Sequence, residues 1–154
     1  MAPTDSVTVD PDADPLLHLA FTGLDHAIDS VEASGGPLIP FLFARTGERL
    51  TLHRFAVDRL EDGVTEVEQR LEAVMAGTDG EHIVGVDAEV DGACGAWDGY
   101  ITVEGRRTDA VLARAVDRTG AEVVLAQRYE VRGVLRKTAR RVGNVALLAD
   151  NRGE

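Results

Sequence analysis

The chain has 154 residues, of which 44% are hydrophobic and 28% are charged, and its formal net charge is −11. A chain of this length can bury one hydrophobic core without disulfides or metal. No apolar run approaches the ~18 residues of a membrane-spanning helix, and a single cysteine, Cys94, excludes a disulfide framework. An isoelectric point near 4.7 argues against general binding to nucleic acid. The first residues resemble neither a secretory signal nor a transit peptide, so we expect a cytoplasmic protein.

Residues 1–14 are rich in aspartate and proline and show no sustained apolar period, so we expect a disordered acidic tail there. Asp14 followed by Pro15 predicts the start of a helix, with an aspartate as N-cap and a proline in the first turn. The apolar residues that follow recur every three or four positions and form one stripe of an amphipathic helix: Leu17, Phe21, Leu24, Ile28 and Val31. The pair Gly35-Gly36 should end this helix.

Two apolar-rich runs come next, residues 38–45 and 49–57, and the loop Thr46-Gly47-Glu48 joins them. The length and glycine content of that loop predict a β-hairpin. A second amphipathic helix should follow, because Val64, Val67, Leu71 and Val74 repeat at helical spacing and Gly77 ends the pattern.

The second half of the chain is richer in strand signals. Residues 84–90 alternate between small apolar side chains and glycine or acidic residues, which predicts a strand with one wet and one dry face. A glycine-rich loop is expected at 92–98, and further strands at 100–105 and 121–131. Residues 109–117 fit either a helix capped by Thr108 or a strand that turns at 117–120. We favour the strand, because the turn residues separate two valine-rich runs of similar length.

The order of these elements predicts the α+β class, with two amphipathic helices packed on one face of a largely antiparallel sheet of about five to six strands. Residues 15–149 should form a single domain, and residues 150–154 a short C-terminal tail.

Histidine and carboxylate groups suggest weak candidates for a metal site. His18, His26 and Asp29 lie on the polar side of the first predicted helix, and imidazole with carboxylate is an ordinary ligand set for zinc or manganese. Asp87, Glu89 and Asp91 form a row of carboxylates that could bind Mg²⁺. Solvated polar faces explain both groups more simply, since neither has the spacing of a known metal motif.

The loop expected at 92–98 holds Cys94 and Trp97, and a glycine-rich loop can bring backbone N–H groups to an anion. Cys94 has no neighbouring cation or histidine in the sequence to stabilise a thiolate, so an incidental cysteine is favoured over a nucleophile. Trp97 should cover the core at the start of a strand rather than stack on a ligand. The chain has no phosphate-binding or dinucleotide-binding glycine motif, and we expect no cofactor and no catalytic residues.

The most informative feature is the distribution of charge. Residues 1–91 carry a net charge of −14, whereas residues 92–154 carry +3. Six cations fall within fourteen residues that contain only one acid, Glu130: Arg128, Arg132, Arg136, Lys137, Arg140 and Arg141. This basic segment could bind an anion or an acidic partner. In a protein this acidic, we favour contact with carboxylates of the second helix (Glu61, Glu68, Glu72) or of a second copy of the chain.

These observations favour a small non-catalytic protein that acts by protein–protein association, either as a homodimer or other homo-oligomer or by binding a basic partner. The alternative is a small metal-assisted hydrolase or an anion- or ligand-binding domain. We expect no membrane association and no nucleic-acid partner.

Overall fold

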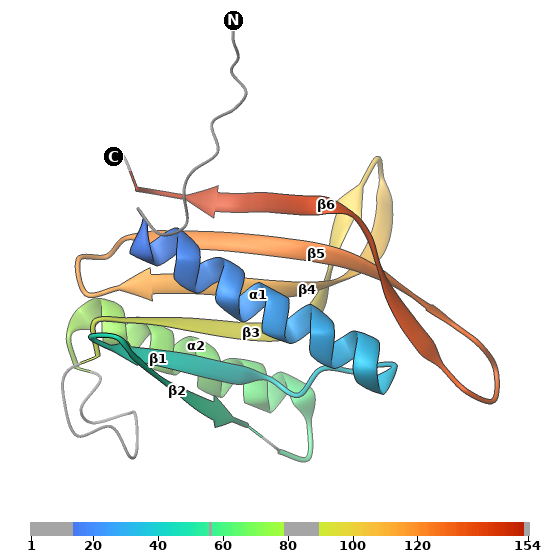
Figure 1. The fold of residues 1–154 in the computed structure, drawn as a ribbon, viewed down its shortest axis with the longest axis horizontal. Helices are drawn as coiled ribbons and strands as arrows, with labels where there is room; N and C mark the ends of the chain where they lie inside the picture. The colour runs from blue at the N-terminus through green and yellow to red at the C-terminus, as the bar shows by residue number, and fades with distance from the viewer. Residues whose placement is uncertain (1–13, 56, 79–89, 153–154) are drawn as a thin grey trace, which may run out of the picture.

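A computed structural model describes residues 14–55, 57–78 and 90–152 of the chain. The elements in chain order are α1 (Pro15–Ser34), β1 (Phe41–Thr46), β2 (Arg49–Arg54), α2 (Leu60–Ala76), β3 (Gly92–Val103), β4 (Arg106–Asp117), β5 (Glu122–Arg132) and β6 (Thr138–Asp150). The strands form one six-stranded sheet in the order β2-β1-β3-β4-β5-β6, and every neighbouring pair is antiparallel. The predicted α+β class, with two helices on an antiparallel sheet, is confirmed (Figure 1). The strand predicted at 84–90 falls largely outside the described residues.

Helix α1 begins and ends as its sequence predicts. The Asp14 carboxylate accepts the N–H of Leu17 at 3.1 Å, and Pro15 occupies the first turn, where its missing N–H costs nothing. At the other end Gly35 adopts the left-handed conformation and its N–H returns to the carbonyl of Val31. The helix buries an apolar stripe that includes Leu24 and Ile28, each about 1% exposed.

The two helices cover opposite faces of the sheet, so the prediction that both pack on one face is wrong. A methyl group at Gly23 of α1 would overlap the Cys94 sulfur, whereas one at Gly95 would overlap Val67 of α2. Cys94 and Gly95 are neighbours in β3, and successive strand residues point to opposite faces. Figure 1 shows α1 in front of the sheet and α2 behind it. The sheet is therefore buried on both faces near Cys94, which explains why the sequence there does not alternate between apolar and polar residues.

Strand β3 occupies the segment that the sequence analysis assigned to a loop at 92–98. Its first five residues, Gly92–Ala96, are buried, and each is glycine, alanine or cysteine. Small side chains are required here because α1 approaches one face and α2 the other, and Leu71 Cδ1 would lie only 3.1 Å from a Cβ at Gly95. Glycine therefore marks close packing in this segment rather than a turn.

Residues 109–117 form a strand, as favoured, within β4. The turn that follows is stabilised by Asp117, whose carboxylate accepts N–H groups of Thr119 at 2.9 Å and Ala121 at 3.2 Å. Strand β5 matches the predicted strand at 121–131 closely.

Strand β6 was not predicted as a strand. It pairs with β5 and forms one edge of the sheet, and its register shifts opposite residues 124–128 of β5. The buried amide of Gln127 explains how this bulge is tolerated, because it donates to the carbonyls of Val142 at 3.1 Å and Gly143 at 3.2 Å.

Neither described helix combines the length and the apolar character needed to cross a membrane.

Candidate functional site

The β5–β6 hairpin extends past the rest of the sheet as an arm, which we define as residues 130–140 (Figure 1). At its tip Val134 and Leu135 are 94% and 102% exposed, the highest values among the described large apolar side chains. Exposed apolar side chains that lie together on a protruding element are unusual on a monomer and commonly mark a contact surface.

The arm is also strongly basic. Its cations are Arg132, Arg136, Lys137 and Arg140, and all four residues are exposed. Arg132 pairs with Glu130 at 3.1 Å within the arm. Within the described part of the chain, Arg136, Lys137 and Arg140 have no ion-pair partner.

Arg141, at the base of the arm, is held by helix α1. Its guanidinium lies 2.8 Å from Asp29 Oδ1 and 2.8 Å from Glu32 Oε1, and its backbone N–H donates to Glu32 at 3.0 Å. These hydrogen bonds from Arg141 lower the pKa of Glu32 and raise the pKa of Arg141 itself. The basic segment therefore contacts the first helix in this structure, and not the second helix that the sequence analysis favoured. On the second helix, Glu72 is paired with Arg114 at 2.9 Å.

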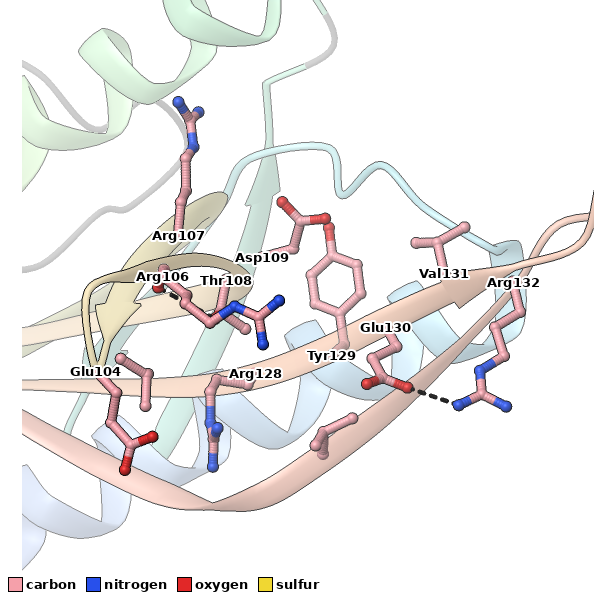
Figure 2. Close-up of a pocket in the computed structure, with 12 residues that line it drawn as sticks. Glu104, Arg106, Arg107, Thr108, Asp109, Arg128, Tyr129, Glu130, Val131 and Arg132 are labelled. Carbon is pink, nitrogen blue, oxygen red and sulfur yellow. Dashed lines mark hydrogen bonds and ion pairs between the residues drawn. The ribbon is translucent and has the colours of Figure 1, made fainter.

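A hollow of about 660 Å³ lies between the arm and the end of the β3–β4 hairpin (Figure 2). Twelve residues line it: Val103, Glu104, Arg106, Arg107, Thr108, Asp109, Arg128, Tyr129, Glu130, Val131, Arg132 and Val142. Cations outnumber acids among them, in contrast to the chain as a whole.

Two of the hollow's lining side chains, Arg107 and Tyr129, point to the face that α1 covers. The Arg107 guanidinium lies 3.7 Å from the centroid of the Tyr100 ring, and the Tyr129 hydroxyl donates to Asp98 at 2.6 Å. Burial and the Asp98 carboxylate raise the pKa of Tyr129 well above its ordinary value. These groups are engaged in the fold, and Arg132 pairs with Glu130, so Arg106 and Arg128 are the cations of the hollow that have no ion-pair partner among the described residues.

The structure separates the residues proposed for a metal site. His18 is exposed and lines a different hollow from His26, whose ring packs edge-on against Phe41 at 4.9 Å. Asp29 pairs with Arg141, and Asp91 accepts the backbone N–H of Gly47 at the β1–β2 turn. Asp87 and Glu89 lie outside the described residues. Within the described ranges no group of three or more His, Cys, Asp and Glu side chains could hold a metal ion.

The residues proposed for a loop site, Cys94 and Trp97, belong to the interior of β3. The Cys94 side chain is fully buried, and burial raises the pKa of its thiol to about 12. Trp97 is half-buried and packs against the apolar cluster beneath α2, as expected of a residue that covers the core. The structure does not bring Cys94 to the surface, so it offers no support for a nucleophile.

Sequence reasoning missed Arg106, because it lies 22 residues before Arg128 and the two meet only through the β4–β5 pairing. The one available signal is the turn Glu104-Gly105 between two strands, which returns the chain and places Arg106 at a hairpin end.

No protein-family model, curated protein or solved structure matches this chain.

Proposed function

We propose that the protein is a non-catalytic module that acts by self-association, with the arm of one copy docking on helix α2 of another. The observation that carries the proposal is the exposed pair Val134 and Leu135 at the tip of an arm in which Arg136, Lys137 and Arg140 have no ion-pair partner among the described residues.

Charge supports a second copy as the occupant. Residues 128–141 carry a net charge of +5, so the rest of the chain carries −16. A basic arm on an acidic body is complementary to the body of another copy, which favours encounter and orientation.

Helix α2 offers a matching surface. A shallow hollow of about 730 Å³ on its outer side has Ala73 and Ala76 among its lining residues, and Glu68 and Glu72 contribute carboxylates. Apolar groups with flanking acids complement Val134 and Leu135 with their flanking cations. The arm belongs to β5 and β6, whereas α2 lies over β1, β3 and β4, so this pairing suits two copies.

A symmetric dimer would use each contact twice, since each copy has one arm and one α2 surface. Fully burying one leucine or valine contributes about 1.5–3 kcal/mol. Because a substitution removes the side chain from both contacts, loss of either tip side chain should cost about 3–6 kcal/mol and raise the dissociation constant by roughly a hundredfold or more.

The oligomeric state of the full chain, measured by native mass spectrometry and light scattering, tests the proposal. We expect a dimer or larger closed assembly for the wild type and monomers for Leu135→Asp. The matched control is Leu50→Asp on β2, because Leu50 is also an exposed leucine, at 41%, but lies on the opposite edge strand. A monomeric wild type, or an assembly that is unaffected by Leu135→Asp, would contradict the proposal.

Charge reversal tests the choice of partner surface. Arg136→Glu and Glu68→Lys should each weaken the assembly, and the double variant should recover part of the loss, because the reversed charges meet again across the interface. If the losses of affinity from the two substitutions simply add in the double variant, the arm docks on a surface other than helix α2.

A further inference from the structure

We infer that the hollow between the arm and the β3–β4 hairpin is a binding site for a small organic phosphate, held by Arg106 and Arg128. This inference goes beyond self-association and uses neither the arm tip nor helix α2.

Arg106 and Arg128 project on the same side of the sheet. Arg128 is opposite Ala110 in the β4–β5 register, and Arg106 lies an even number of residues from Ala110 on β4, so both face away from α1. Figure 2 shows both side chains in the hollow, on the side away from Arg107. Helix α2 contacts β1, β3 and β4 on this face, and none of its residues lines the hollow at the far end of the β3–β4 hairpin.

Neither guanidinium has an ion-pair partner among the described residues, although Glu104 and Glu130 line the same hollow. Glu130 is already paired with Arg132. The protein has a net charge of −11, but these two guanidiniums make the local electrostatic potential of the hollow positive. A concave site with a positive potential attracts anions.

The fold positions Arg128 rather than leaving it free. Gly143 lies in the bulge of β6 with a φ of +73°, and a Cβ there would overlap the Arg128 guanidinium. The buried Gln127 amide fixes the bulge by donating to the Val142 and Gly143 carbonyls. β-Bulges commonly change the direction of a side chain beside a functional site. At this bulge the Arg128 guanidinium lies against the backbone of β6 at Gly143.

The chemistry of the lining selects the ligand class. Guanidinium forks match phosphate oxygens in pairs. Thr108 lines the same wall, and its hydroxyl donates to the Arg106 carbonyl at 3.4 Å. Val103 and Val142 supply apolar contact for an organic group. A volume of about 660 Å³ lies within the ~300–1,000 Å³ of small-molecule sites and exceeds what a bare phosphate fills.

Pyrophosphate is the probe, because its two phosphate groups can engage both guanidiniums. Isothermal titration calorimetry of the full chain, with sodium chloride added to hold ionic strength constant, should show saturable binding. Arg106→Gln and Arg128→Gln should each raise the dissociation constant for pyrophosphate by about tenfold or more. Glu104→Gln should strengthen binding, since it removes a carboxylate from the hollow.

Arg49→Gln is the matched control. It changes the net charge equally, but Arg49 is an exposed arginine of β2, on the opposite edge of the sheet, and does not line the hollow. We expect it to leave the affinity within about twofold. Equal losses in Arg106→Gln and Arg49→Gln would show general charge attraction and overturn the site, as would the absence of saturable binding at millimolar pyrophosphate. Repeating the titration on Leu135→Asp separates this inference from self-association, because binding should persist in that variant whether or not the chain dimerises.

Discussion

The contact between Gly23 of α1 and Cys94 of β3 gives the sharpest test of how the helices sit on the sheet. Gly23 is in the middle of a 20-residue helix, where alanine is ordinarily favoured over glycine by about 1 kcal/mol. Here a methyl group would overlap the Cys94 sulfur and would lie 3.4 Å from its Cβ. Overpacking a closed core costs about 1–3 kcal/mol. Gly23→Ala should therefore destabilise the protein by up to about 2 kcal/mol.

The sign of this effect should reverse when the sulfur is removed. In a Cys94→Ala background the methyl at position 23 fills the space that the sulfur leaves, so the helix preference remains and Gly23→Ala should stabilise by about 1 kcal/mol. Urea denaturation, followed by fluorescence of the single tryptophan, Trp97, measures all four members of the cycle. The expected coupling between the two positions is about 1–3 kcal/mol.

Gly95→Ala provides the control on the opposite face. Its methyl would overlap Val67 of α2, so Val67→Ala should relieve its cost and Cys94→Ala should not. A value for Gly23→Ala that is the same with and without the sulfur would refute the packing of α1 against β3 described above. Relief of Gly95→Ala by Cys94→Ala would refute the assignment of the helices to opposite faces.

Three further predictions follow from single residues. Burial and the charge of Arg70 lower the pKa of His53, whose buried Nε2 has no hydrogen-bond partner among the described residues. As the pH falls, the unfolded chain therefore binds a proton before the folded chain does. The free energy of unfolding should fall as pH drops below about 6.5, the ordinary histidine pKa, and it should fall less in His53→Leu; identical pH profiles from chemical denaturation would contradict this. Glu104 has a φ of +51°, which asparagine tolerates better, so Glu104→Asn should raise the stability by about 0.5–1 kcal/mol, and an unchanged melting temperature would argue against this turn. The Cys94 thiol should resist alkylation at pH 8 in the native state and react only as the chain unfolds, whereas rapid labelling of native protein would show an accessible thiolate.

Local signals predicted those elements whose ends and faces are encoded in neighbouring residues. Helix α1 is the clearest example, because the Asp14 cap, Pro15, an apolar stripe and Gly35 all lie within about twenty residues of one another. The start of β3 could not be recognised in this way. Its run of small residues reflects the approach of two helices from opposite sides, and that approach is a property of the tertiary structure.

Strand β6 escaped prediction for a different reason. Although Ala139 is buried, the residues beside it are charged on both faces, with Arg140 on one and Arg141 on the other, so the two-residue period of apolar side chains disappears. The bulge at Gly143 then interrupts the period again. The density of cations marked residues 128–141 as a basic segment, but it could not show which of these cations would be neutralised, because that depends on the strand register.

Register assigns different roles to adjacent arginines. Arg141 is opposite Tyr129 and faces α1, where Glu32 neutralises it, whereas Arg140 is opposite Glu130 and faces away from that helix. Successive residues of β4 also point to opposite faces, so Arg107 stacks on Tyr100 whereas Arg106 lies in the hollow. Helix α1 contacts β3, β4, β5 and β6, so it meets the arginines of its face, whereas α2 lies over β1, β3 and β4 and leaves the far end of the opposite face uncovered. The unequal cover of the two faces is therefore the physical reason that Arg106, Arg128 and Arg140 share a side of the sheet where an anion or an acidic surface can reach them.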